Sequence, residues 1–155
     1  MYDNRNVISI TRYGHIMRDL EKILIEKNIS PTAVRLLVLD YFLKQNSAVS
    51  LSDLESDFDH SDRTTLFRTL KTFERKGLLH SIKDGNNAAS YALCTDNCSE
   101  SHHLDSHLHF YCTSCKKTFC LSNTHLPKIK VPDHFHLEEL NITARGLCDK
   151  CASHH

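Results

Sequence analysis

Two cysteine pairs in the last third of the chain constrain its fold more than any other feature. Cys112 and Cys115 form one Cys-x-x-Cys motif, and Cys148 and Cys151 form another. Each motif offers two thiolates from one tight turn, and two motifs complete a tetrahedral sulfur site for zinc. The gap between the motifs is longer than is usual for such sites. We therefore expect segment 116–147 to form structure of its own, with structural Zn²⁺ holding its ends together.

Disulfides and free buried thiols are the alternatives to a zinc site, and the sequence favours neither. The seven cysteines are an odd count, and the N-terminus lacks the cationic-then-apolar pattern of a secretory signal. A reducing cytoplasm keeps cysteines as thiols, and no apolar run approaches the length of a membrane span. We therefore predict a cytoplasmic protein with no membrane partner.

Charge is balanced over the whole chain but unevenly distributed along it. There are 19 basic and 19 acidic side chains, yet every charge in 51–62 is acidic and most charges in 63–83 are basic. Phosphate attraction acts over roughly 8–10 Å, so a local basic patch can bind DNA without a net positive charge. The patch needs a suitable scaffold before it indicates DNA binding.

Apolar periodicity predicts four helices in the first half of the chain. We expect them at 15–28, 32–45, about 51–58 and 61–76, with the last ending at Gly77. Ser50 or Ser52 caps the third helix, and Ser52 and Glu55 have the spacing of a capping box. The residues expected to be buried in the second helix are Val34, Leu37, Val38, Tyr41 and Phe42.

Two strands at 78–83 and 89–94 follow, joined by a hairpin turn at 84–87. Helices followed by such a hairpin are typical of a winged helix-turn-helix, in which the helix before the wing enters the major groove of double-stranded DNA. For Phe67, a position in the hydrophobic core is an equally good interpretation. The candidate DNA-binding residues are Arg63, Thr64, Thr65, Phe67, Arg68 and Lys71.

The second half predicts a small α/β domain, so the fold class is α+β. We place a winged-helix domain at 1–94, a polar linker at 95–106 and a metal-binding domain at 107–155. Strand alternation puts His107 and His109 on one face, and Cys120 on the opposite face to its apolar neighbours. Phe135, Leu137, Leu140 and Ile142 suggest later strands that lead back to the second cysteine pair. The remaining candidates in the linker are Cys98, His102 and His103, for which a solvated loop is the more usual interpretation.

The ordered set of motifs resembles the ferric-uptake-regulator (Fur) family of bacterial metalloregulatory repressors. The matching segments are Thr32-Ala-Val-Arg35, Thr65-Leu-Phe67-Arg68, Asp84-Gly85, His107-x-His109-x-x-Cys112-x-x-Cys115 and Gly146-Leu-Cys148-x-x-Cys151. The resemblance implies a cytoplasmic homodimer with an N-terminal winged helix and a C-terminal dimerisation domain. It also implies binding to palindromic operators when a metal occupies a site at the hinge between the domains.

Departures from the iron-sensing pattern make the chain similar to the zinc-uptake-regulator (Zur) branch. The positions that match three ligands of iron sensors hold Ala48, Ala92 and Cys120. Thiolate in place of carboxylate favours Zn²⁺ over Fe²⁺ or Mn²⁺. Zinc needs about four ligands, so one hinge candidate should lie outside the coordination shell, and Cys120 is the weakest of them. The hinge candidates are His80, Cys94, His107, His109 and Cys120.

Pro127 and Pro132 fall in segment 124–132, where relatives have a longer helix at the dimer interface. Two prolines so close together should shorten or remove that helix. We therefore expect the dimer of this chain to differ in its geometry.

The predicted function is a zinc-responsive transcriptional repressor, and the sequence has four alternative interpretations. They are an iron- or peroxide-sensing member of the same family, a thiol-based oxidation sensor, a zinc deaminase and a structural zinc module. A deaminase needs a His-x-Glu ahead of a Pro-Cys-x-x-Cys. Here the one His-x-Glu is His136-Leu-Glu138, and neither cysteine pair follows a proline. We therefore predict no enzymatic activity and no small-molecule substrate.

Overall fold

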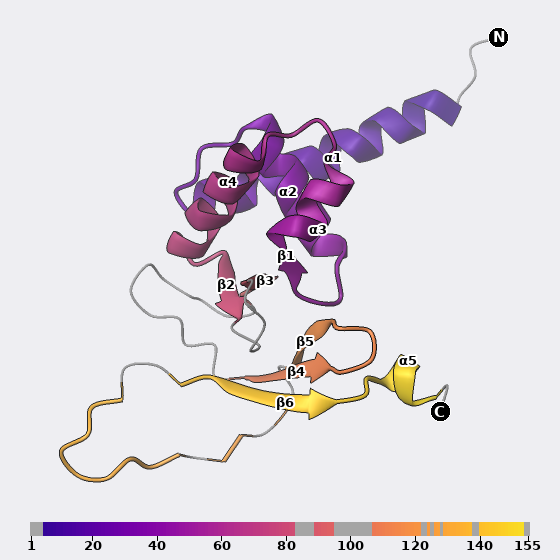
Figure 1. Cartoon of the computed structure of the whole chain (residues 1–155). Coiled ribbons are helices and arrows are strands. Elements are labelled where there is room, and N and C mark those ends of the chain that lie inside the picture. Colours follow the sequence, from indigo (N-terminus) through magenta and orange to yellow (C-terminus); the bar gives the residue numbers. More distant parts are fainter. Residues whose placement is uncertain are drawn as a thin grey trace.

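A helical unit lies above a small sheet in the protein, which is a computed structural model (Figure 1). The structure describes residues 5–82, 89–94, 107–121, 124, 126–127, 129–137 and 140–153, and residues 5–15 by their backbone alone. The described part of the upper unit contains α1 (Arg5–Glu26), α2 (Ala33–Lys44), α3 (Leu51–Asp57) and α4 (Arg63–Arg75). The first helix begins well before the position expected from the sequence. None of the described helices is long and apolar enough to span a membrane.

Polar side chains set where the short helices begin. Thr32 accepts a hydrogen bond from the backbone N–H of Arg35 and caps α2, and Asp62 caps α4 in the same way through Thr65. Helix α3 begins with a capping box between Ser50 and Asp53. The box expected between Ser52 and Glu55 was therefore wrong, because the helix starts one residue after Ser50 and both residues lie inside it.

Gly77 ends α4 as the sequence predicts. Its φ of 66° is in the left-handed region. The N–H of Gly77 donates to the Glu74 carbonyl at 3.0 Å, and the N–H of Leu78 donates to the Phe73 carbonyl at 2.9 Å. These two bonds form a Schellman motif, which satisfies the last carbonyls of the helix and turns the chain into the wing.

The wing is a three-stranded antiparallel sheet made of β1 (Val49–Ser50), β2 (Leu79–Ile82) and β3 (Ser90–Leu93), in the order β1-β3-β2. Strand β1 was not predicted. The register places Leu79 opposite Leu93 and His80 opposite Ala92. The predicted turn at 84–87 lies outside the described residues. Helices α2 to α4 followed by this sheet make a winged helix-turn-helix.

The hydrophobic core lies between the helices and the wing. Leu24, Leu39, Leu54 and Phe73 are fully buried in it. Leu37 was expected in this core but is 52% exposed. Helix α2 is turned so that Leu36, Val38, Leu39 and Phe42 are buried instead.

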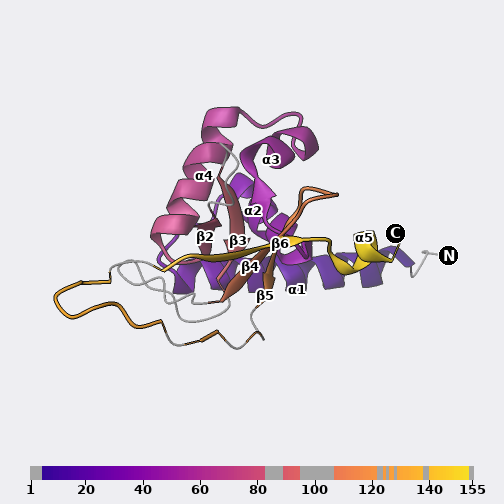
Figure 2. The ribbon, with the colours of Figure 1, turned by 60° about the horizontal axis from the view of Figure 1, so that its bottom comes forward.

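The lower unit is a second three-stranded sheet, with the short helix α5 (Asp149–Ala152) after it. Its strands are β4 (Leu108–Cys112), β5 (Thr118–Leu121) and β6 (Ile142–Gly146), in the order β5-β4-β6. Strand β6 runs parallel to β4, and the view from below shows it in front of the other two (Figure 2). Of the four residues expected in later strands, Ile142 begins β6, whereas Phe135, Leu137 and Leu140 lie outside any strand and are exposed.

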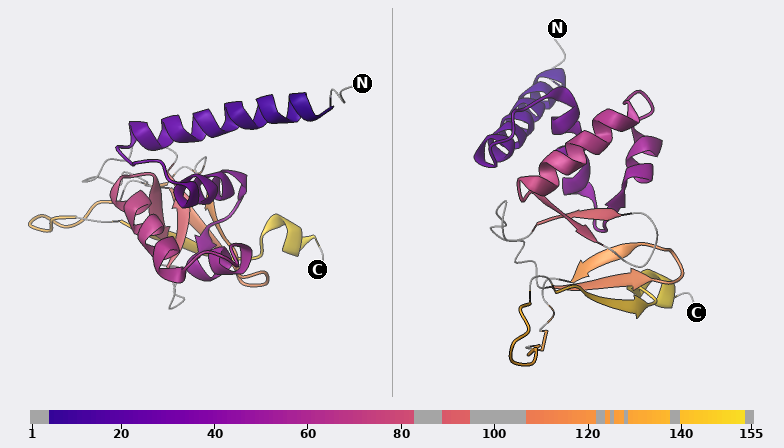
Figure 3. Two further views of the ribbon diagram at one scale, coloured as in Figure 1. Left: turned by 90° about the horizontal axis from the view of Figure 1, so that it is seen from above. Right: turned by 60° about the vertical axis from the view of Figure 1, so that its left-hand side comes forward.

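The two units meet where the wing faces β4 and β5 (Figure 3). The backbone N–H of Ala48 donates to the carbonyl of Thr118 at 2.7 Å, which joins the residue before β1 to the start of β5. On the far side of the helical unit, α1 extends away from the rest of the chain (Figure 3). The predicted linker at 95–106 lies outside the described residues.

Candidate metal centres and nucleic-acid interface

The four paired cysteines come together at one end of the lower sheet. Cys112 ends β4, Cys115 follows in the turn, and Cys148 and Cys151 lie at the start and within α5. Their four Sγ atoms all lie within 4.8 Å of one another. The six described cysteines are free thiols, so these four are not paired as disulfides. Lys116 adopts a φ of 63°, which folds the first pair into a tight turn.

Hydrogen bonds and proximity give the thiols of this cluster different acidities. The backbone N–H of Cys148 donates to Cys112 Sγ at 3.3 Å. This bond, helped by hydrogen bonds from Cys115 and Ser114, lowers the pKa of the Cys112 thiol to about 6 even though burial opposes the shift. A bond from Ser114 favours the Cys151 thiolate, but the neighbouring sulfurs and burial outweigh it and raise the pKa of Cys151 to about 11. Crowded thiolates repel one another, and a divalent cation would neutralise that repulsion.

A second cluster lies between the two units. It comprises His80, His107, His109 and Cys120, whose ligand atoms all lie within 4.8 Å of one another. His109 and Cys120 are direct neighbours across β4 and β5. His80 comes from β2 of the wing and is the one residue of this cluster contributed by the helical unit. All three histidines are buried.

Cys94, the fifth hinge candidate, lies outside this group of four. It follows β3, and its Sγ lies 3.8 Å from Nδ1 of His80. The other ring nitrogen of His80, Nε2, lies 3.3 Å from Nε2 of His109 and 3.7 Å from Sγ of Cys120. The imidazole of His80 is therefore flanked by one sulfur on each side.

The histidines also favour the thiolate of Cys120. Burial by itself would raise the pKa of this thiol, but hydrogen bonds from His107, His109 and His80, together with the charge of His80, lower it to about 5. A thiolate at neutral pH beside three imidazoles is a soft donor set that suits zinc. A cavity of about 130 Å³ adjoins Cys120, and Ala48 and Ala92 are among its lining residues.

The outer face of α4 carries the residues expected to contact DNA. Leu66, Leu70 and Phe73 are buried, whereas Arg63, Thr64, Thr65, Arg68 and Lys71 are exposed. Phe67 is 44% exposed, so it lies on the outer face and not in the core. Lys71 Nζ lies 5.9 Å from the centre of the Phe67 ring and 2.7 Å from a Glu74 carboxylate oxygen. That carboxylate raises the pKa of Lys71.

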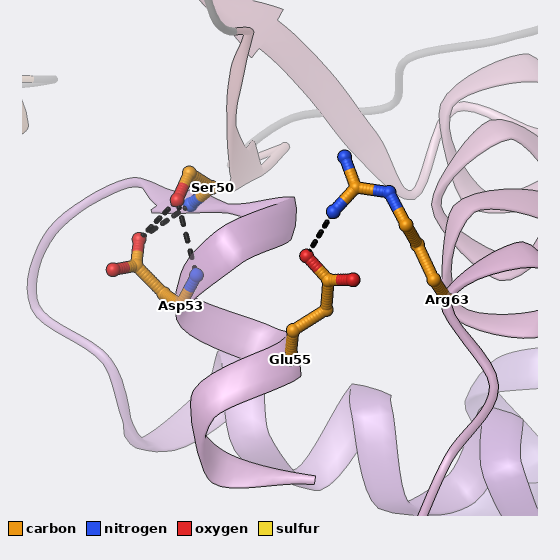
Figure 4. A network of polar contacts seen from close by, with 4 residues as sticks. All are labelled: Ser50, Asp53, Glu55 and Arg63. Carbon is orange, nitrogen blue, oxygen red and sulfur yellow. Dashed lines mark hydrogen bonds and ion pairs between the residues drawn. The ribbon is translucent and has the colours of Figure 1, made fainter. Parts of the chain in front are cut away.

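Arg63 is held at the start of α4 by an ion pair with Glu55 of α3 (Figure 4). Ser50 and Asp53 form the N-terminal cap of α3 beside this ion pair (Figure 4). Both partners of the ion pair are partly exposed, and such pairs contribute at most about 1 kcal/mol to stability. Arg63 can therefore exchange Glu55 for a phosphate at little cost.

Two basic residues on this face were missed as candidates. Arg35 of α2 and Arg75 of α4 line a shallow hollow with Phe67, Arg68 and Lys71. The guanidinium of Arg35 donates to the Ser30 carbonyl at 2.8 Å, which orients it beside α4. A sequence signal existed for Arg75, since it continues the basic run of α4. Arg35 was part of the family-like segment Thr32-Ala-Val-Arg35, but its place on this face was not predicted because it depends on the packing of α2 against α4.

Three further candidates, Cys98, His102 and His103, lie outside the described residues. Pro127 and Pro132 are described, and the described residues of segment 124–132 form no helix.

Comparisons with known proteins agree with this architecture. The sequence profile of the "Ferric uptake regulator family" matches residues 26–144. A "Ferric uptake regulation protein" of Synechococcus elongatus is 28% identical over 116 residues, which cover 72% of this chain and 66% of that protein. The chain therefore spans about two thirds of the length of this relative.

Solved structures share the fold, among them the following two. A zinc uptake regulator in complex with zinc and DNA superposes with a TM-score of 0.61 at 22% identity, covering 90% of this chain and 95% of the other. The ferric uptake regulator of Vibrio cholerae gives a TM-score of 0.57 at 16% identity, covering 83% and 98%. The profile match spans most of the winged helix and of the lower sheet, and the chain belongs to the ferric uptake regulator family.

Proposed function

We propose that this protein is a zinc-responsive transcriptional repressor that binds palindromic operator DNA as a homodimer. The observation that carries the proposal is the position of His80. This residue belongs to the DNA-binding unit, yet its ring lies among His107, His109 and Cys120 of the lower sheet. A metal bound there would join the two units of one chain.

The donor set supports zinc at both clusters. Four cysteine thiolates are a typical structural zinc site, and three imidazoles with one thiolate can supply tetrahedral coordination. Carboxylate oxygens, which suit Fe²⁺ and Mn²⁺ better, are absent from both described clusters. Zinc would hold the ends of the lower sheet together at the first cluster and the two units together at the second.

The exposed face of α4 supports DNA as the partner. In a winged helix-turn-helix this helix enters the major groove, and here its outward side chains are hydroxyls, cations and one aromatic ring. Two such helices in a dimer must be spaced by about 34–36 Å to enter successive turns of the duplex. A metal that fixes the angle between the units would fix that spacing.

The relatives support metal-dependent gene regulation in general terms. The family is one of transcription regulators and not of enzymes. One structure of the same fold holds zinc and DNA, whereas the 28% identical relative is named for ferric uptake. The choice of zinc therefore rests on the donor atoms of this chain.

Metal analysis tests the proposal directly. Protein purified aerobically without added metal, then titrated with zinc or ferrous iron, should hold two zinc ions per chain, one for each cluster. Operator binding, measured by fluorescence anisotropy, should require the second zinc. His109→Ala should lose zinc binding at the second cluster, so operator binding should become weak and independent of zinc. His136→Ala is the matched control because His136 is exposed and belongs to neither cluster.

One zinc per chain together with selective iron binding would contradict the proposal and indicate an iron sensor. Zinc-dependent operator binding by His109→Ala at the parent's affinity would show that the sensing site lies elsewhere.

A further inference from the structure

We propose that Cys94 is a positioning residue for His80 and that Cys120 supplies the sulfur ligand of the hinge site. This inference rests on the proposed function and refines it, because it assigns different roles to two cysteines that the sequence treats as equal candidates. In this arrangement Cys94 binds Nδ1 of His80, and the metal takes Nε2 of the same ring.

The distances around His80 carry the assignment. A neutral imidazole offers one lone pair, so only one ring nitrogen binds the metal while the other donates a proton. Nε2 faces the cluster, at 3.3 Å from Nε2 of His109 and 3.7 Å from Sγ of Cys120. Nδ1 faces away from the cluster toward Sγ of Cys94, at 3.8 Å. The sulfur on the Nδ1 side is therefore a hydrogen-bond partner of the ligand.

The pairing of the wing strands explains why Cys94 stays beside His80. His80 is directly opposite Ala92 in the β2–β3 register. Cys94 is two residues further along, so it lies on the same face as Ala92 and diagonal to His80. Its backbone N–H donates to the Leu78 carbonyl at 3.1 Å, which continues the strand pairing to this position. Cys94 and His80 are thus held together within the wing alone.

Cys120 belongs to the other unit. It lies on β5 opposite His109, so it approaches His80 only when the wing and the lower sheet are in contact. The proposed pair of roles follows from this difference. Cys94 fixes the orientation and tautomer of His80 before the units meet, and Cys120 completes the metal site when they do.

Partners that hold a histidine ligand in this way change metal affinity without changing the coordination shell. Loss of such a partner typically weakens metal binding by about 10–100-fold. A serine hydroxyl can still accept a hydrogen bond from Nδ1–H, whereas an alanine side chain cannot. The role therefore predicts that Cys94→Ser and Cys94→Ala behave differently, which a sulfur ligand would not.

Cobalt substitution separates the two roles. Chains that keep zinc in the four-cysteine site are titrated with Co²⁺ at the hinge, and the sulfur-to-cobalt charge-transfer band reports a bound thiolate. We expect the parent, Cys94→Ser and Cys94→Ala to show this band with equal intensity at saturation. Cys94→Ser should bind cobalt within a few-fold of the parent, and Cys94→Ala about 10–100-fold more weakly. Cys120→Ser is the matched control and should lose the band.

Loss of the charge-transfer band in Cys94→Ser, with the band retained in Cys120→Ser, would overturn the assignment while leaving the proposed function intact. Equal weakening by Cys94→Ser and Cys94→Ala would also overturn it. A parent protein that takes up no second metal would overturn the proposed function itself, and this role with it.

Discussion

The charge of the Cys120 side chain at the hinge is subject to two opposing effects. Cys120 is partly buried, which disfavours a charge, yet three imidazoles point toward it and favour the thiolate. The result is a thiol that needs no base to become a metal ligand at neutral pH. Metal binding here would release few protons, because the Cys120 thiol has already lost its proton, whereas an ordinary cysteine loses it when the metal binds.

The acidity of Cys120 gives the first prediction. In metal-free protein, the ultraviolet absorbance of the Cys120 thiolate should disappear on acidification with a midpoint near pH 5, in line with a pKa of about 5. The signal is the difference between the titration curves of the parent and of Cys120→Ser. The pKa of Cys120 is lower in the folded state, so its thiolate stabilises the fold. This contribution is fully present above the ordinary pKa of 9.0 and is lost as the pH falls toward 5.

Cys94→Ser is the control, because its titration should still show the absorbance change of the Cys120 thiolate. A midpoint for Cys120 near that of an ordinary thiol would contradict the prediction.

The outer face of α4 gives the second prediction, from two neighbouring residues with different chemistry. Arg68→Ala should weaken operator binding and reduce the slope of affinity against salt by about 1, since Arg68 is the residue that we expect to contact a phosphate. Phe67→Ala should mainly relax sequence preference, because an aromatic ring contacts thymine methyl groups and not phosphates. Fluorescence anisotropy with operator and scrambled duplexes at several salt concentrations measures both effects.

Binding of both variants like the parent would exclude α4 as the reading helix. Lys130→Ala, an exposed cation of the lower unit, is the control for a general change in charge.

Much of the site could be predicted from individual residues, because the spacing of cysteines and histidines along the chain is sufficient to identify them as metal ligands. The two Cys-x-x-Cys pairs and the alternation of His107 with His109 place six side chains without knowledge of the fold. The relative positions of Cys94 and Cys120 could not be predicted. They depend on how the wing approaches β5, and no local pattern encodes the contact of two units. Leu37 was misplaced for a similar reason, since several apolar residues in α2 leave its rotation to the packing.

Helix α4 ends at a glycine in the left-handed region. Gly77 adopts a left-handed φ that other residues take up at a cost. Gly77→Ala should therefore lower the free energy of unfolding by roughly 1–2 kcal/mol, measured by urea denaturation of the zinc-loaded protein. Asn28 also has a positive φ, of 55°, and Asn28→Gly should change stability by less than about 0.5 kcal/mol. Equal stability of Gly77→Ala and the parent would show that the left-handed turn is not required.

The lower sheet depends on the metal site at its end. Cys112 ends β4 opposite Gly146 of β6, so the four-cysteine cluster joins the two parallel strands. Cys148→Ser should lose one zinc per chain and the protection of β4–β6 amides from hydrogen exchange, because metal binding and folding are coupled in small domains. The buried core of the helical unit should keep its protection. A stable protein with unchanged zinc content would contradict this prediction.

Elements with strong local signals were predicted well, and those that depend on distant partners were not. Helices α2 to α4 and strands β2 to β5 lie close to their expected positions. The two-residue strand β1 forms only because β3 pairs with it, and its two residues carry no periodicity. The parallel pairing of β6 with β4 was also not predicted, because the segment between them gives no sign of strand direction.

At the scale of the whole chain, the two units are joined by described contacts of different kinds. One is the backbone hydrogen bond from Ala48 to Thr118, which needs no metal. Another is the group of donors around His80. A cleft of about 440 Å³ lies between the helical unit and the first cysteine turn, and its lining includes Asp53 and Asp57 of α3 and Lys116 and Lys117 of the turn.

His80→Ala should separate metal binding from communication between the units. His109 and Cys120 remain paired in the lower sheet with His107 directly before β4, and three protein ligands with a water molecule can still hold zinc. We expect weaker zinc binding that no longer changes the radius of gyration in small-angle X-ray scattering. The parent should become more compact on adding the second zinc. A zinc-dependent compaction of His80→Ala equal to that of the parent would contradict the bridging role.

The parallel pairing of β4 with β6 also affects the order in which the protein can fold as it is synthesised. Strand β4 is central in its sheet, yet β6 and the second cysteine pair follow every other described strand along the chain. Contacts between segments so distant in sequence form late. The winged helix can therefore fold while the chain is still attached to the ribosome, before the lower sheet can close. A nascent regulator would acquire its DNA-reading surface first and its metal control last.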